Sequence, residues 1–105
     1  MDDKTSAKYE AQAEIVKALA HPTRLYIVDQ LSREEKCVCE LTKKIGTDMS
    51  TVSRHLSVLK KAGIVQMDKR GLKVYYQLKV PCVMKFFECT ESVIRNTAKE
   101  RLDTV

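Results

Sequence analysis

Three amphipathic helices are predicted in the first 46 residues from the spacing of apolar positions. Across residues 5–20 apolar side chains recur every three or four positions, which is the period of a helix with one buried face. A second helix is expected from Pro22, a residue suited to the first helical turn, to about residue 32. A third is expected over residues 38–45, with Gly46 placed to end it because glycine accepts the left-handed conformation past a helix C-terminus.

A fourth helix is predicted after a turn of only three residues, 47–49. Ser50 is expected at its N-cap or within one residue of it, since a serine hydroxyl can accept from a free backbone N–H of the first turn. Val52, Leu56 and Leu59 form its apolar stripe, and Gly63 is expected to close it. Two helices joined by so short a turn predict a helix-turn-helix.

The apolar period changes after Gly63. Residues 72–79 alternate apolar and polar side chains, as in a half-buried strand, and residues 64–67 supply a partner strand with residues 68–71 as the turn. A last helix is expected from Pro81 to about Leu102. The prediction is a mainly α fold with a small β-hairpin, in the order α-α-α-α-β-β-α of a winged helix-turn-helix, as one domain over residues 1–105.

Composition narrows the class of protein. The first residues carry no apolar signal-peptide core, and no apolar run approaches the roughly 20 residues that span a bilayer. A cytoplasmic protein without a membrane segment is therefore expected. The four cysteines are then more readily explained as thiols than as disulfides, because that compartment is reducing.

Positive charge is concentrated in the segment that holds the fourth helix and the hairpin. Residues 49–79 contain seven basic residues and one acid, a net +6, whereas the whole chain carries +5, so the remainder sums to −1. Such a concentration is typical of a surface that binds a polyanion, although solvated surface can also be basic.

The polar face of the fourth helix opposes its apolar stripe and suits double-stranded DNA. Short hydroxyls allow close approach to a groove, and basic side chains can bind base edges or phosphates. The candidates on this helix are Ser50, Thr51, Ser53, Arg54, His55, Ser57 and Lys61. The candidates on the hairpin, as a wing, are Lys69, Arg70 and Lys73. His55 is equally well explained as a packed helix residue, and the helix alone could be an ordinary solvated surface.

Four segments together resemble successive elements of the ArsR/SmtB family of winged-helix metal-responsive repressors. They are KALAHPTRLYIVDQL, CVCEL, STVSRHLSVLKKAGIV and GLKVYYQL. The resemblance covers nearly the whole chain. It implies a homodimer formed through the first and last helices, an apo-protein that represses an operator, and release by an inducer bound at cysteines in the positions of Cys37 and Cys39. CVCEL is similar to the arsenic- and antimony-responsive branch, which is favoured, and to the cadmium- and lead-responsive branch.

The sequence departs from each of these branches. Thr42 stands where the arsenic branch often has a third cysteine, and the first 36 residues contain no cysteine of the kind the cadmium branch uses. The last helix contains no histidine, so the zinc site of another branch is not expected.

Cys37 and Cys39 suit a soft ion, because thiolates bind As(III), Sb(III), Cd(II), Pb(II) and, less selectively, Zn(II). Residues two apart lie about 200° apart around an ideal helix, so chelation is expected to require a non-helical start of the third helix. Arg33 and Lys36 are expected nearby and would favour thiolate. The alternative is one buried and one capping cysteine with no ligand.

Cys82 and Cys89 lie seven residues apart, about 10 Å along a helix axis, so they cannot bind the same ion from one straight helix. With Phe86 and Val93 they form a stripe that indicates core or dimer contact. Two further interpretations are that Cys82 or Cys89 supplies a third ligand to an ion at Cys37 and Cys39, or that they form a separate site between subunits.

Three other functions compete with an inducer-released repressor. A thiol-based redox regulator of the same fold would use Cys37 with Cys39, or Cys82 with Cys89 across a dimer. A thiol enzyme is not expected, because neither histidine is paired with a cysteine as a base. A winged helix used only for protein contacts is disfavoured by the concentrated positive charge.

Overall fold

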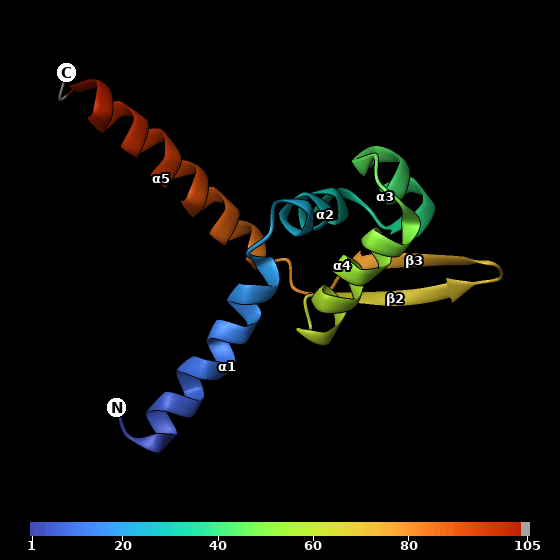
Figure 1. Cartoon of the computed structure of the whole chain (residues 1–105), viewed down its shortest axis with the longest axis horizontal. Coiled ribbons are helices and arrows are strands. Elements are labelled where there is room, and N and C mark those ends of the chain that lie inside the picture. Colours follow the sequence, from blue (N-terminus) through green and yellow to red (C-terminus); the bar gives the residue numbers. More distant parts are fainter. Residues whose placement is uncertain (104–105) are drawn as a thin grey trace.

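The computed structural model describes residues 1–103. In that part of the chain the elements run α1 (Asp3–Leu19), α2 (Pro22–Arg33), β1 (Lys36–Cys37), α3 (Val38–Ile45), α4 (Met49–Lys61), β2 (Val65–Arg70), β3 (Lys73–Leu78) and α5 (Val83–Asp103). The predicted winged helix-turn-helix is confirmed, with one short strand, β1, added to the predicted order. Figure 1 shows α2, α3 and α4 gathered against the hairpin, while α1 and α5 extend away from this body.

One hydrophobic core joins the three body helices to the base of the sheet. On α4 the predicted stripe of Val52, Leu56 and Leu59 is completely buried. The other buried members of the core are Ala18, Leu19, Ile27, Val28, Leu31, Leu41, Ile64, Val65 and Tyr76. Because one face of α4 is fixed in this core, its opposite face must point outward.

The start of α4 differs from the prediction. The helix begins at Met49 and its N-cap is Asp48, two residues before Ser50. Asp48 accepts hydrogen bonds from the hydroxyls of Ser50 and Thr51. Asp48 thus occupies the N-cap position, but its carboxylate accepts from the two hydroxyls and makes no capping hydrogen bond to a backbone N–H of the first turn.

The hairpin is longer than predicted. The expected turn over residues 68–71 is wrong, because Asp68, Lys69 and Arg70 belong to β2 and the strands turn at Gly71 and Leu72. Gly71 has a φ of 61° and Leu72 does not have a positive φ, which is the pattern of a type II′ turn. Only Val65 of β2 is buried. Since both faces of β2 beyond Val65 contact solvent, no alternation of apolar residues marks this strand.

A two-residue strand was not predicted, because so short an element has no readable period. β1 pairs antiparallel with β3, with Lys36 opposite Tyr76 and Cys37 opposite Tyr75. The sheet order is therefore β1-β3-β2, with β3 in the centre. This pairing fixes the segment before α3 to the hairpin.

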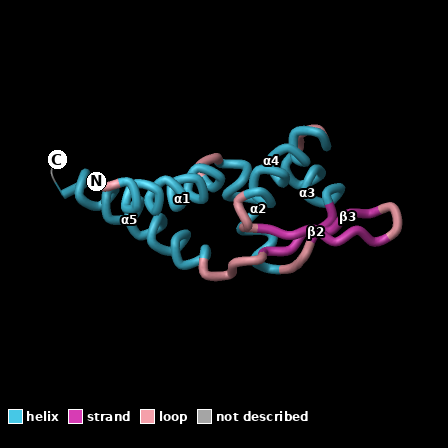
Figure 2. The backbone as a smooth tube through the Cα atoms, turned by 90° about the horizontal axis from the view of Figure 1, so that it is seen from below, coloured by secondary structure: helices cyan, strands magenta, loops and turns pink. Residues whose placement is uncertain are grey.

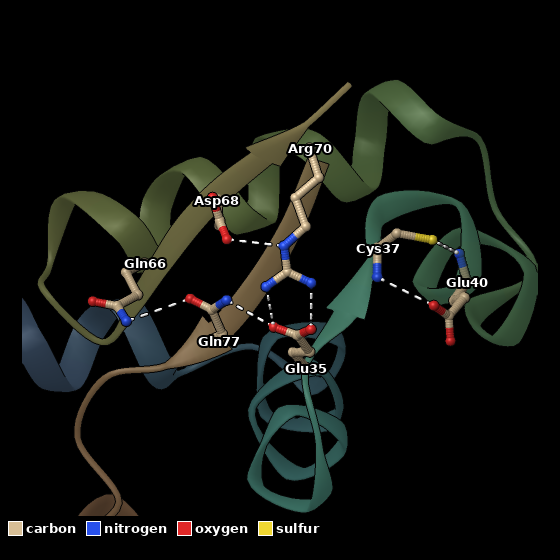
Figure 3. A network of polar contacts seen from close by, with 7 residues as sticks. All are labelled: Glu35, Cys37, Glu40, Gln66, Asp68, Arg70 and Gln77. Carbon is tan, nitrogen blue, oxygen red and sulfur yellow. Dashed lines mark hydrogen bonds and ion pairs between the residues drawn. The ribbon is translucent and has the colours of Figure 1, made fainter. Parts of the chain in front are cut away.

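A polar network reinforces the same connection, as Figure 3 shows. The guanidinium of Arg70 at the end of β2 makes a bidentate ion pair with Glu35, just before β1, and its Nε lies 2.9 Å from Asp68. Glu35 also accepts from the Gln77 amide at 2.8 Å. These bonds hold the pKa of Glu35 down to about 2, chiefly through the hydrogen bond from Arg70 and then that from Gln77.

The two long helices expose apolar surface. No residue of α5 is buried in the single chain, so the predicted stripe of Cys82, Phe86, Cys89 and Val93 is not part of the core. In Figure 2 α1 and α5 lie at the end of the molecule remote from the hairpin tip. No helix within residues 1–103 has the length and apolar character needed to cross a membrane.

Substituting a core residue of α4 should cost much more stability than substituting an exposed one. Leu56→Ala is expected to lower the free energy of unfolding by about 2–5 kcal/mol, because it leaves a cavity in a fully buried position. Val58→Ala, on the same helix with a side chain 38% exposed, should change it by less than about 1 kcal/mol. Urea denaturation of both variants measures the difference, and similar losses would contradict the packing described.

The Glu35–Arg70 contact should make stability depend on pH in a defined direction. Because the folded-state pKa of Glu35, about 2, is below its ordinary 4.5, the contact stabilises the fold above about pH 4.5 and is lost as the pH falls toward 2. Glu35→Gln should therefore be less stable than the parent at neutral pH, with the gap narrowing as the pH falls. Urea unfolding at several pH values measures this, with Glu14→Gln, in an exposed pair with Lys17, as control. If the difference in unfolding free energy between Glu35→Gln and the parent did not change with pH, the Glu35–Arg70 contact would be ruled out.

Candidate nucleic-acid interface and thiol site

The outward face of α4 presents most of the side chains predicted to contact DNA. Ser50, Ser53, Arg54, Ser57 and Lys61 are exposed. Thr51 and His55 are partly buried and lie on the flank of the helix that faces α2. The structure therefore brings five of the seven α4 candidates onto an open surface and places the other two at its border.

An acid at the edge of this surface was missed by sequence reasoning. No acid occurs within Met49–Lys61, as predicted, but Asp48 caps the helix. The hydrogen bonds from Ser50 and then Thr51 hold the pKa of its carboxyl well below the ordinary range. Two of the candidate hydroxyls are thus occupied by Asp48, whereas no such bond ties Ser53 or Ser57. An Asp followed by Ser and Thr before an apolar stripe was the available signal.

His55 is packed against another ring. Its imidazole lies 4.4 Å, centroid to centroid, from that of His21, which caps α2 by accepting from the Thr23 N–H through Nδ1. Burial, followed by electrostatic interactions with His21, Arg24 and Arg54, lowers the pKa of His55. These contacts favour the interpretation of His55 as a packed helix residue, and a contact with DNA stays a prediction.

The wing candidates differ from one another. Lys69 and Lys73 are exposed near the hairpin tip, while Arg70 is held by Glu35 and Asp68, and its guanidinium lies 4.7 Å from the centre of the Tyr75 ring. Arg70 would have to exchange Glu35 for a phosphate in order to bind DNA. Glu35 gave no periodic or motif signal, because its partner is 35 residues away.

The two central cysteines lie at the junction of β1 and α3. Cys37 is the extended N-cap of α3 and Cys39 lies in its first turn, with Cα atoms 5.4 Å apart and the sulfurs joined as a disulfide. The expectation that the chain must be non-helical here for the sulfurs to meet agrees with the extended backbone of Cys37, and Cys39 can lie inside the first turn of the helix. The Glu40 N–H donates to Cys37 Sγ, and the Cys37 N–H donates to the Glu40 carboxylate, each at 3.4 Å.

The cysteine pair borders the DNA-binding elements. It lines a pocket of about 250 Å³. The lining residues are Cys37, Val38, Cys39, Met49, Ser53, Leu72, Lys73 and Val74. Met49 and Ser53 belong to α4, and the last three residues belong to the wing. Any group that enlarges or reshapes this pocket therefore contacts both candidate DNA-binding elements.

The ligand set offered by one chain is limited to these two sulfurs. Among residues 1–103 no group of three His, Cys, Asp or Glu side chains is placed to hold a metal ion. Cys82 and Cys89 are exposed thiols and do not join Cys37 and Cys39 as a third ligand within the chain. Thr42 donates its hydroxyl to the Val38 carbonyl. Once the Cys37–Cys39 disulfide is reduced, the two thiolates would fit a soft thiophilic ion by their donor chemistry.

The cations expected beside the thiols have other partners. Arg33 pairs with Asp29 at 3.2 Å, and the buried Lys36 pairs with Glu34 at 3.1 Å. The expectation that these two charges favour a thiolate is therefore not supported by their contacts.

Comparison with known proteins identifies the family. Residues 21–67 match the model of the bacterial regulatory proteins of the arsR family. The chain is 43% identical over 72 residues to the uncharacterized HTH-type transcriptional regulator MJ1325 of Methanocaldococcus jannaschii, covering 68% of this chain and 81% of that protein. It is 41% identical over 69 residues to the HTH-type transcriptional repressor SmtB of Mycobacterium tuberculosis, covering 66% of this chain and 51% of the repressor.

A solved structure agrees with this relationship. The solution structure of a homodimeric winged helix-turn-helix DNA-binding domain, Mb0332 of Mycobacterium bovis, matches with a TM-score of 0.73 and 28% identity. The match covers 100% of this chain and 94% of that one. Together with the exposed polar face of α4 and the basic wing, these similarities show that the chain belongs to the ArsR/SmtB family of winged helix-turn-helix transcriptional regulators.

Proposed function

We propose that this protein is a homodimeric cytoplasmic repressor that binds operator DNA through α4 and the wing. The inducer that releases it is As(III) or Sb(III), or another soft ion such as Cd(II), Pb(II) or Zn(II), at Cys37 and Cys39. The observation that carries the proposal is the pocket in which both cysteines lie against residues of α4 and the wing. A ligand at this point can alter the DNA-binding surface directly.

The DNA-binding part of the proposal is supported by the orientation of α4. Its apolar stripe is buried in the core, so Ser53, Arg54, Ser57 and Lys61 form an open polar face. An α-helix with such a face fits the major groove, where an arginine can bind the edge of a guanine and lysines can bind phosphates. Lys69 and Lys73 extend the positive surface along the hairpin, as expected for a wing that contacts the adjacent backbone.

The dimer is supported by the unpacked long helices. A cleft of about 270 Å³ between α1 and α5 is lined almost entirely by apolar side chains. They are Val16, Leu19, Ala20, Leu25, Phe86, Phe87 and Ile94, with Thr90. Exposed apolar surface of this kind marks an interface, and the Mb0332 domain that resembles this chain is homodimeric. We propose that the partner's first and last helices cover it, which would place two copies of α4 to contact two DNA half-sites.

The inducer part rests on where the sulfurs lie. In the reduced protein, where the Cys37–Cys39 disulfide has been converted to two thiols by a thiol reductant, a thiophilic ion would replace the two thiol protons and bond to both sulfurs, holding them farther apart than the disulfide does. Cys37 must then adjust at the N-cap of α3, where its sulfur accepts from the Glu40 N–H. Because β1 is paired to β3, the adjustment reaches the wing as well as α3. A differential affinity of a few kcal/mol between the two conformations is enough to shift the population.

A second candidate function is a thiol redox switch, favoured by the Cys37–Cys39 disulfide. Two thiols would be oxidised to the disulfide, with two electrons and two protons passing to an oxidant such as a peroxide. The resulting change in the positions of the two sulfurs would reach α4 and the wing through the pocket that all of them line.

Removing Arg54 should weaken specific DNA binding. Arg54→Ala is expected to cost about 1–3 kcal/mol, which is roughly 5- to 150-fold in affinity, and to relax the preference at one base position. Fluorescence anisotropy can measure this on a duplex of roughly 30 base pairs, enriched from a random pool and long enough for two half-sites. The control is Lys4→Gln, which removes a positive charge near the N-terminus, far from α4 (Figure 1). Equal affinities for parent and Arg54→Ala would reject α4 as the DNA-binding helix.

Soft ions should release the DNA through the central cysteines. Under reducing conditions, arsenite, antimonite, cadmium, lead and zinc are each titrated into the protein–DNA complex, and at least one should raise the dissociation constant tenfold or more. Cys37→Ser/Cys39→Ser should abolish the response. Cys82→Ser/Cys89→Ser should preserve it unless the partner chain supplies a third ligand.

The same titration separates the two candidate functions. Release by peroxide, reversed by a thiol reductant and unaffected by every ion, would replace the inducer proposal with the redox switch. A response that survives loss of both Cys37 and Cys39 would place the effector site elsewhere.

A further inference from the structure

A second polar pocket lies on the flank of α4 that faces α2. It has a volume of about 280 Å³. Its lining residues are Arg24 of α2 and Thr51, Arg54, His55 and Val58 of α4. The His21 ring contacts the His55 ring beside it, with the two planes tilted by 43°. This pocket is separate from the one bordered by Cys37 and Cys39, because the two share no lining residue.

The pocket gathers positive charge without a carboxylate. Two guanidinium groups line it, and among the ion pairs formed within residues 1–103 none includes Arg24 or Arg54. The Arg54 side chain donates to Thr51 Oγ1 at 3.4 Å, which leaves most of its donors free. The charges of Arg24 and Arg54 also contribute to the lowered pKa of His55, after the larger effect of burial. The arrangement has unrelieved repulsion that an anion would remove.

Arg24 has a polar atom that lacks a partner. Its Nε is buried and makes no hydrogen bond. Buried donors are nearly always paired in folded proteins, so an isolated one indicates an absent acceptor. A guanidinium fork beside a second guanidinium matches the oxygens of a phosphate or another tetrahedral oxyanion.

We propose that Arg24 binds a phosphate of the DNA backbone beside the groove that α4 occupies, in the pocket that Arg54 and Thr51 also line. This inference rests on the proposed DNA-binding function and adds α2 to the interface. The outward face of α4 and this flank meet at Arg54, so a strand that borders the groove passes the pocket. A free oxyanion such as sulfate has the same chemistry, and the experiment distinguishes the two sources.

The test compares Arg24→Gln and Arg24→Lys with the parent and with the Lys4→Gln control. Arg24→Gln should weaken binding to the enriched duplex and to a random duplex of equal length by a similar factor, roughly tenfold at moderate salt, because a phosphate contact does not depend on base sequence. It should also reduce the slope of log affinity against log salt concentration by about 1. Arg24→Lys should keep the parent slope while recovering only part of the affinity.

A merely structural role for Arg24 gives a different result. Arg24→Gln would then lower the thermal midpoint and the DNA affinity while leaving the salt slope unchanged, which would overturn the proposal. If Arg24→Gln leaves DNA binding intact while Arg54→Ala weakens it, the proposal fails and the DNA-binding function stands. If neither variant affects binding, the proposed function fails as well.

A second measurement addresses the source of the oxyanion. The pKa of His55 is measured by NMR in chloride and in sulfate buffers of equal ionic strength, for the parent and for Arg24→Gln. Sulfate could raise the His55 pKa of the parent but not that of Arg24→Gln, while Arg24→Gln binds DNA as tightly as the parent. This result would make the pocket a site for a free oxyanion and overturn the assignment to DNA. A loss of DNA affinity with the reduced salt slope supports it.

Discussion

The burial of one face of α4 is the constraint on which the remaining surfaces depend. Val52, Leu56 and Leu59 are completely excluded from solvent, and a side chain of this size gains about 1.5–3 kcal/mol from burial. A rotation of the helix would expose all three, so the helix has one stable orientation about its axis. That orientation decides which polar residues form the open face, which line the cysteine pocket and which border α2.

The two flanks of α4 therefore have different environments. On one flank Met49 and Ser53 face the cysteine pair and the wing. On the other, Thr51 and His55 face Arg24 and the α2 N-cap. The cysteine pocket and the arginine pocket are thus separated by the width of one helix, and both are lined by residues of α4.

The short strand β1 gives the cysteines their mechanical connection. Cys37 belongs to the sheet and caps α3 at the same time, so its sulfur cannot move without affecting one of them. The Glu35–Arg70 contact adds a second link from the same segment to the end of β2. The long helices α1 and α5 contribute little to this core. Their apolar surface is instead available to a second copy of the chain.

The amino-acid sequence by itself determined the helices of the body, the hairpin, the positive face and the pair of central cysteines. These features depend on the spacing of apolar residues, on charge and on residue type, all of which can be recognised within one segment of the sequence. The apolar stripe of α4 predicts that helix, and the glycine after α3 predicts where that helix ends, without knowledge of the residues they contact. The family resemblance in CVCEL and the α4 segment depends on the same local information.

Only the tertiary structure decided which distant side chains meet. Three contacts join segments more than 30 residues apart, and no periodicity in the sequence encodes them. They are the pairing of β1 with β3, the ion pair of Glu35 with Arg70, and the ring contact of His21 with His55. Capping at Asp48 and the meeting of Cys37 with Cys39 across a helix boundary depend on where a helix starts to within one residue. That boundary is set by packing and hydrogen-bond competition in the folded chain rather than by the pattern of apolar positions.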